Sequence, residues 1–312
     1  RNMDSLSQRP GSRISKRFIG REMDNPKQRT EKFMRRNFAT ILKEAKVNIQ
    51  DEYARLYAIF YDKYLYENGN NFSFYDLIEA SFSGFWFRGT CVSLADFNET
   101  HEFSFEKEPQ DFNLDYLISF CEYVYNLTMG FMGCNNTYAS FFNTQRIIEQ
   151  IFCIIEKIGY MQSSEDGFTI FVEKNQAAIS VSEIVSQEIS YKVISYNHHT
   201  MHGNIEGKKA ILLILANQLE PQEKKLNQID ATFKSELFFA FNNLNIRHNN
   251  IDPSDKRYYN KAVAEMSEEE LEHWYDKTYQ MCLLAFLRIE HIERKKAINE
   301  LKKKVEAKDG NT

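Results

Sequence analysis

Glycine and proline are scarce in this chain of 312 residues, which has 12 Gly and 5 Pro. Typical proteins contain about 7% and 5% of these residues. The scarcity disfavours turn-rich all-β folds and leaves little material for glycine-rich phosphate loops. Long hydrophobic runs are also missing, since the longest aliphatic stretches, such as 210–216, are far shorter than the ~18 residues of a spanning helix. We therefore expect no membrane segment.

The five cysteines are odd in number and widely spread, and no two of them form a CxxC pair. This pattern encodes neither a disulfide framework nor a zinc ribbon. No apolar segment follows the Arg- and Ser-rich start, so a classical secretion signal is not expected. The cytosol is the expected compartment.

The composition, 43% hydrophobic and 27% charged, is that of a folded soluble protein, and the length suggests two domains. The net charge is −5, yet residues 1–36 carry 11 Lys and Arg against 4 Asp and Glu. These cations could contact a phosphate backbone. The alternative is a flexible, solvated basic tail at residues 1–25, which is the interpretation that we favour.

Apolar residues recur at helical spacing through most of the remaining chain. The predicted helical segments are 27–45, 53–64, 114–129, 144–158, 177–193, 205–219 and 223–245, and a last one begins at a capping box of Ser267 and Glu270. Alternation typical of strands is convincing only near residues 160–173. The sequence therefore predicts a mainly α fold, with two helical bundle halves and one small β-hairpin between them. The expected domains are 26–160 and, with the hairpin, 161–312.

The segment 203–209 superficially resembles a phosphate loop, but its spacing is one residue short and Lys209 replaces the hydroxyl that would bind magnesium. We expect a helix start here, with the lysines in solvent.

His198, His199 and His202 form a second polar group. If their segment were helical, His198 and His202 would lie one turn apart, a spacing that lets two imidazoles share a metal ion. The sequence shows no third ligand nearby. We therefore interpret these histidines as structural and expect neither a metal ion nor a cofactor.

The most informative cluster is 242–252, which closes a strongly apolar helix with amides, Arg247 and His248. Such side chains can cap backbone carbonyls and shape the turn before Pro253. They also suit metal-independent cleavage of RNA, with the imidazole moving a proton and the guanidinium stabilising the phosphorane. Arg247 and His248 are the candidate catalytic residues. The candidate binding residues beside them are Asn249, Asn250 and Asp252.

Residues 175–306 resemble the HEPN superfamily, whose members occur in abortive-infection and toxin proteins of prokaryotes. The resemblance rests on the helical content, the Arg-His-Asn loop between two long helices, the segment 196–220 and the run 270–275. It implies an α-helical, often dimeric protein and, for many members, a metal-independent RNase.

The family motif is an Arg, a polar residue and a His after four to six intervening residues. Arg247 and His248 match its start, but Asp252, Pro253 and Ser254 stand where the closing His would fall. Either His248 has taken over proton transfer, or the chain is a non-catalytic member. The leading hypothesis is a HEPN-like defence or toxin-type protein that acts on RNA or serves as a dimeric partner of such a toxin, with a homodimer or a complex with a protein partner expected. The alternative is a non-catalytic helical scaffold or regulatory partner, and enzyme activity is left open.

Overall fold

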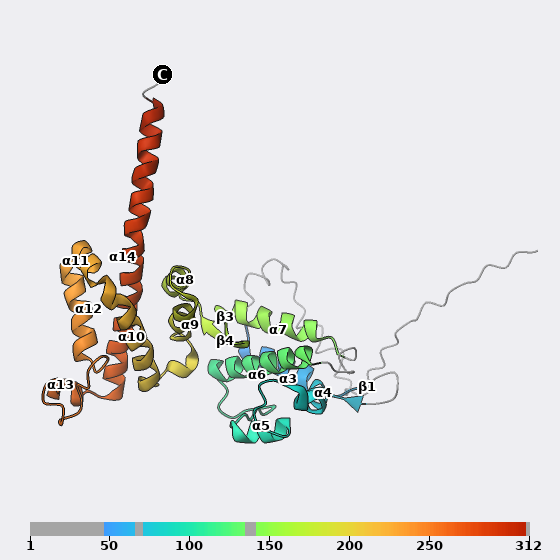
Figure 1. Ribbon diagram of the computed structural model, residues 1–312. Helices are drawn as coiled ribbons and strands as arrows, with labels where there is room; N and C mark the ends of the chain where they lie inside the picture. The colour runs from blue at the N-terminus through green and yellow to red at the C-terminus, as the bar shows by residue number, and fades with distance from the viewer. Residues whose placement is uncertain (1–46, 66–70, 135–141, 310–312) are drawn as a thin grey trace, which may run out of the picture. The chain divides into compact units, whose positions relative to one another are not determined.

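The computed structural model describes residues 47–65, 71–134 and 142–309, and over these residues the protein is mainly helical (Figure 1). The predicted mainly α architecture with a small hairpin is confirmed. The basic tail predicted at 1–25 and the helix predicted at 27–45 lie outside the described residues. Both stay predictions, as do the domain boundaries.

Side-chain caps start the longer helices before the hairpin. Asn113 accepts a hydrogen bond from the Tyr116 amide at 2.9 Å, and Asn143 accepts one from the Arg146 amide at 3.3 Å. The elements are α3 (Ile49–Tyr61), β1 (Tyr64–Leu65), β2 (Asn71–Phe72), α4 (Phe74–Ser81), η1 (Phe82–Gly84), α5 (Leu94–Thr100), α6 (Leu114–Gly133) and α7 (Thr144–Lys157). The two-residue strands β1 and β2 pair antiparallel, and the sequence did not indicate them.

The core of this first part is rich in fully buried aromatic side chains. They include Tyr53, Phe60, Phe74, Phe82, Phe120 and Phe131. Many of these rings meet edge to face, as Phe74 and Phe131 do at 5.3 Å, which is a favourable geometry for aromatic pairs. The aromatic-rich composition is thus used largely for packing.

The predicted hairpin consists of β3 (Tyr160–Glu165) and β4 (Phe168–Glu173), paired antiparallel from Tyr160 with Glu173 to Glu165 with Phe168. Asp166 and Gly167 form its turn, with φ of 52° and 84°. Positive φ at both positions fits a two-residue turn that follows the twist of the strands. Phe171 belongs to the first core and Val172 to a second core, so β4 joins the two.

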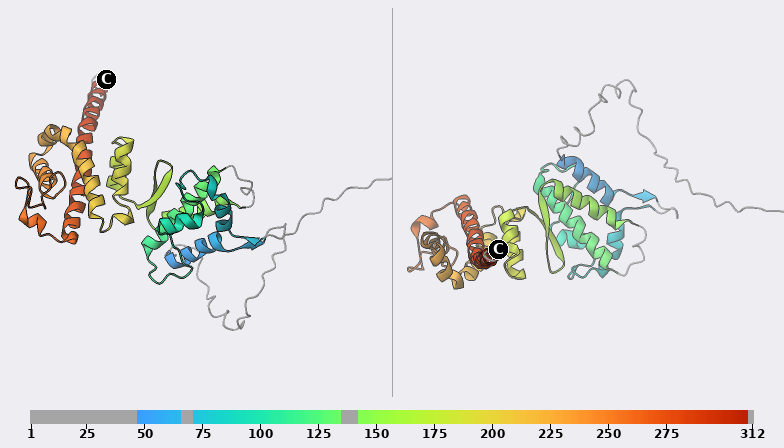
Figure 2. Two further views of the ribbon diagram at one scale, coloured as in Figure 1. Left: turned by 60° about the horizontal axis from the view of Figure 1, so that its bottom comes forward. Right: turned by 90° about the horizontal axis from the view of Figure 1, so that it is seen from above.

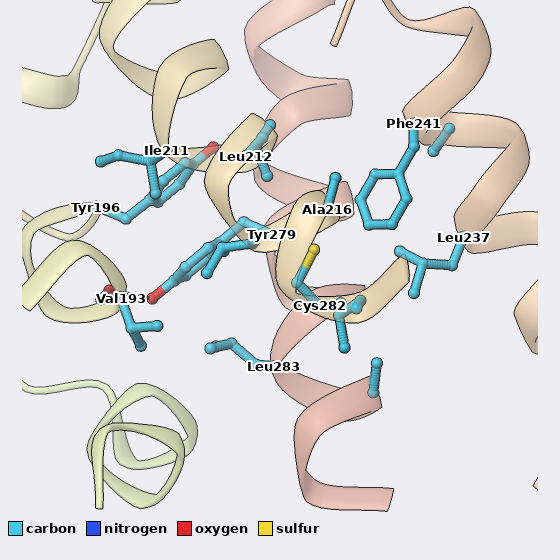
Figure 3. Packing of buried hydrophobic residues seen from close by; sticks show 14 of the residues in the cluster. Val193, Tyr196, Ile211, Leu212, Ala216, Leu237, Phe241, Tyr279, Cys282 and Leu283 are labelled. Atoms are coloured by element: carbon cyan, nitrogen blue, oxygen red, sulfur yellow. Dashed lines mark hydrogen bonds between the residues drawn. The ribbon is translucent and has the colours of Figure 1, made fainter. Parts of the chain in front are cut away.

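The second core lies among the helices after the hairpin. These elements are α8 (Gln176–Ser182), α9 (Gln187–Ser195), η2 (His199–Met201), α10 (Ile205–Leu219), η3 (Glu220–Gln222), α11 (Glu223–Ile229), α12 (Ala231–Asn243), α13 (Lys261–Ala264) and α14 (Glu268–Asp309). Figure 3 shows Tyr196 and Tyr279 side by side in this core, and their stacked rings have centroids 3.9 Å apart. The Tyr279 hydroxyl donates to the Val193 carbonyl at 2.6 Å, which satisfies the one polar atom of this buried ring.

Two predicted helices are each divided in the structure. The segment 223–245 is not one long helix, because Asp230 has an extended backbone and its carboxylate caps α12 by accepting from the Phe233 amide at 2.9 Å. Arg288 of α14 also binds this carboxylate, at 2.9 Å. Likewise, the segment 177–193 is interrupted between α8 and α9. An apolar period alone does not reveal such breaks.

None of the helices that the structure describes combines the length and apolar character needed to cross a bilayer. All five cysteines are free thiols, in agreement with the absence of a disulfide framework in the sequence. The cytosolic location stays a prediction.

Candidate functional site

The carboxylate of Glu122 connects three elements. Glu122 lies on α6, and its Oε1 accepts hydrogen bonds from the Phe171 amide of β4 at 2.6 Å and from His198 Nε2 at 2.8 Å. His198 immediately precedes η2. The side chains of both Glu122 and His198 are largely buried. One carboxylate therefore links a helix of the first core, the hairpin and a segment of the second helical part.

Two adjacent imidazoles face this carboxylate. The Nδ1 of His198 lies 2.7 Å from Thr200 Oγ1, and the Thr200 amide makes a longer contact of 3.4 Å to the same nitrogen. His199 is next to it, with the two ring centroids 4.3 Å apart, and its Nε2 lies 3.3 Å from Ser119 Oγ on α6. Burial, and then the neighbouring His198, lower the pKa of His199. A neutral His199 imidazole offers a nitrogen lone pair to a ligand.

Glu122, His198 and His199 each offer one ligand atom, and these three atoms lie within 4.8 Å of one another. Two imidazoles and a carboxylate are a ligand set used for zinc and for iron(II) in proteins. Among the residues described, this group can hold a transition-metal ion.

A cavity of about 340 Å³ adjoins the group, and its lining includes Glu122, Ser119 and His199 beside the polar residues Asn126, Thr169 and Thr200. The rest of the wall is mainly aromatic and aliphatic, with Phe87, Phe97, Phe103, Tyr123, Leu127, Phe168 and Ile170. An apolar cavity of this size with a few convergent polar groups is typical of a small-molecule site. The arrangement can therefore bring an apolar molecule to the Glu122–His198–His199 group.

The sequence predicted structural histidines and raised a shared metal ion at His198 and His202 only for a helical segment. The segment from His198 to His202 contains a three-residue 3₁₀ turn and is not an α-helix, so the helical spacing of His198 and His202 does not apply. His202 is exposed and lies outside the three-residue group. Glu122 was missed because it precedes His198 by 76 residues, and no local pattern marks one acidic residue of a helix as its partner.

One expectation about the lysines near the start of α10 is wrong. Lys208 is buried, not solvated, with 3% exposure. Its Nζ lies 2.8 Å from Glu272 and 2.6 Å from Asp276, both on α14. These carboxylates compensate the buried ammonium group, so Lys208 joins α10 to α14.

Arg247 points at the end of another helix. Its Nη2 donates to the Ala216 carbonyl in the last turn of α10 at 2.9 Å and lies 3.3 Å from Glu220. The guanidinium also lies over the rings of Phe238 and Phe241. A cation that binds the last carbonyls of a helix stabilises that end. Arg247 therefore makes the contacts expected of a side chain that caps the backbone carbonyls at a helix end.

The other candidate residues of the loop also have local partners. His248 stacks on Tyr258 with ring centroids 3.8 Å apart. Asn250 is buried and donates to the carbonyls of Asn242 and Tyr258 at 3.1 and 2.8 Å. Asn249 donates to Asp252 at 3.3 Å. The side chains of Arg247 and His248 thus contact different groups, and their role in catalysis stays a prediction.

Comparisons of the chain with family models, with curated proteins and with solved structures gave no match. The HEPN resemblance therefore rests on the sequence features alone.

Proposed function

We propose that this protein binds a divalent transition-metal ion through Glu122, His198 and His199, and that the adjoining cavity receives a small, largely apolar molecule. The observation that carries the proposal is that three potential ligand atoms lie within 4.8 Å of one another and that two of these residues, Glu122 and His199, line that cavity. Donors of a tetrahedral zinc ion, bound at 2.0–2.2 Å, lie about 3.3 Å apart. A bound ion would therefore draw together three atoms that now lie within 4.8 Å of one another.

The hydrogen bond between His198 and Glu122 is compatible with metal binding. Its donor nitrogen and acceptor oxygen lie 2.8 Å apart, and a cation bound between them would take the place of the bridging proton. The single proton of the neutral imidazole would then sit on Nδ1 instead of Nε2, where Thr200 Oγ1 at 2.7 Å can accept it. Such a partner on the second nitrogen orients a metal-binding imidazole.

The outer contacts of the group also fit a preorganised site. The Phe171 amide, 2.6 Å from Glu122 Oε1, fixes the carboxylate. Ser119, 3.3 Å from His199 Nε2, fixes the second imidazole. A purely structural link between α6 and η2 needs only Glu122 and His198. The second imidazole supplies the third ligand, which is why metal binding is the function we favour.

Three protein ligands leave at least one coordination position of the ion for water or for a bound molecule. Glu122 and His199 line the aromatic cavity, so this position would face a small apolar compound bound there. A metal ion with an open position can polarise a bound carbonyl or activate water.

RNA cleavage at Arg247 and His248 is less well supported by the geometry, because Arg247 binds the end of α10 and His248 stacks on Tyr258. It stays a separate prediction from the sequence.

Titration calorimetry of untagged protein with ZnCl₂ tests the proposal. We expect one equivalent to bind, and Glu122→Gln and His199→Gln each to weaken binding by more than about tenfold, since even the loss of an outer-shell partner costs that much. His202→Gln is the matched control, because it removes a nearby exposed imidazole, and we expect no change. Wild-type protein that binds no stoichiometric zinc, or binding lost only with His202→Gln, would overturn the proposal. Melting curves identify variants that fail to fold.

A further inference from the structure

Helix α14 continues as one helix from Glu268 to Asp309. Its first part packs in the second core through residues such as Tyr275, Tyr279 and Cys282. Every residue from Glu293 to Glu306, in contrast, is exposed. Figures 1 and 2 show this red segment extending beyond the helices that surround the first part of α14. It is independent of the Glu122 site.

Three large apolar residues lie on this exposed segment. Ile298, Leu301 and Val305 are 51%, 56% and 53% exposed. Their spacing of three and four residues places them on one face of the helix, and it matches the a and d positions of a coiled-coil heptad. A short helical segment without tertiary contacts is marginally stable in water, and within the described part of the chain nothing buries this face.

The charges around this apolar face are unevenly placed. With Ile298 at position a, three lysines occupy flanking e and g positions: Lys295, Lys302 and Lys304. The three glutamates of the segment, Glu293, Glu300 and Glu306, fall at the outer b and c positions. Residues at e and g contact a partner helix and select it by charge. The face is therefore bordered by positive charge, although the chain as a whole is acidic.

We propose that residues 293–306 of α14 bind an amphipathic helix of another protein that carries acidic residues beside its apolar face, forming a short two-helix coiled coil. The apolar residues of the partner cover Ile298, Leu301 and Val305, and its carboxylates pair with the flanking lysines. A second copy of this chain would bring the same lysine-rich border to the interface. Like charges at facing positions oppose association.

Fluorescence anisotropy with the full chain and two labelled synthetic peptides tests this proposal. Both peptides have about four heptads with Leu at every a and d position, and they differ only in having Glu or Lys at e and g. We expect the acidic peptide to bind at least about tenfold more tightly than the basic one and to weaken as salt is added. A triple variant, Ile298→Ser, Leu301→Ser and Val305→Ser, should lose binding by about tenfold or more.

The matched control is Glu293→Ser, Glu300→Ser and Glu306→Ser, which introduces as many serines on the outer face. It should retain affinity for the acidic peptide. Circular dichroism establishes that both triple variants keep comparable helix content. Equal binding of the two peptides, or full binding by the Ile298 triple variant, would overturn the proposal. So would a dimer in sedimentation that the same triple variant dissociates, because the occupant would then be a second copy.

Discussion

His198 Nε2 lies 2.8 Å from Glu122 Oε1, although the two residues are 76 positions apart in the chain. The same carboxylate oxygen accepts the amide of Phe171 at 2.6 Å. Buried polar groups are normally hydrogen-bonded. Here the Glu122 carboxylate accepts hydrogen bonds from both the His198 ring and the Phe171 amide. This cluster holds Glu122 and His198 in place beside His199, the third residue of the proposed metal site.

Zinc should stabilise the folded protein. A ligand that binds only the native state at about 100 times its Kd adds about 2.7 kcal/mol, which raises the melting temperature of a chain of this size by several degrees. Differential scanning fluorimetry should show a rise for wild-type protein, reversed by a chelator. Glu122→Gln, which removes one ligand, should show no rise. An equal rise in both proteins would place the zinc elsewhere.

A cobalt-loaded protein should respond to small anions. If three protein ligands leave a coordination position open toward the cavity lined by His199 and Glu122, azide can bind the ion directly. We expect the visible absorption bands of the Co²⁺ complex to shift on addition of azide. Bands that stay unchanged at saturating azide would indicate a closed coordination sphere, contrary to an open site.

Arg247→Ala should lower the free energy of unfolding by about 1–3 kcal/mol, because it removes the hydrogen bond to the buried end of α10. Chemical denaturation measures this loss. Arg257→Ala, an exposed arginine of the same loop, is the control and should change stability by no more than about 0.5 kcal/mol. If Arg247→Ala instead kept full stability and abolished RNA cleavage, the catalytic hypothesis from the sequence would be right.

The contact between Lys208 and Glu272 should make stability depend on pH in acid. The hydrogen bond from Lys208 is the main reason that the pKa of Glu272 lies below its usual 4.5. A carboxyl with a lowered pKa contributes stability that is fully present above its unfolded pKa and is lost as the pH falls through its folded pKa. Glu272→Gln should therefore destabilise the protein by about 1 kcal/mol at neutral pH.

The difference in free energy of unfolding between Glu272→Gln and the wild type should shrink below about pH 4.5, the usual pKa of a glutamate carboxyl. Urea unfolding at several pH values measures it. Glu269→Gln, at an exposed carboxyl near the start of the same helix, serves as the control. A wild-type–Glu272→Gln difference that stays constant into acid would show that Glu272 does not act through its charge.

Local sequence patterns predicted much of the fold, because the spacing of apolar residues reflects which face of a helix or strand is buried. The apolar period placed α7, and the alternating residues placed the hairpin at its observed strands. The break at Asp230 escaped this reasoning. Its carboxylate caps a new helix and binds Arg288, and the second contact exists only once α14 has packed.

The site was harder to predict than the fold. The histidines were visible as a cluster, but the proposed site also needs Glu122, which α6 and the hairpin bring to them. The cluster around Arg247 stood out in the sequence because it is polar. In the structure Arg247 binds the Ala216 carbonyl and Glu220 at the end of α10, so capping of that helix accounts for its charge. A polar cluster within one segment is visible in sequence, whereas a site assembled across two helical parts is not.

Anomalous diffraction at the zinc absorption edge, from crystals soaked in ZnCl₂, tests the central claim most directly. The account predicts one strong peak about 2.0–2.2 Å from a nitrogen of His198, a nitrogen of His199 and a carboxylate oxygen of Glu122. A peak confined to other residues, such as His202 or Cys153, or no peak within bonding distance of Glu122, would contradict it.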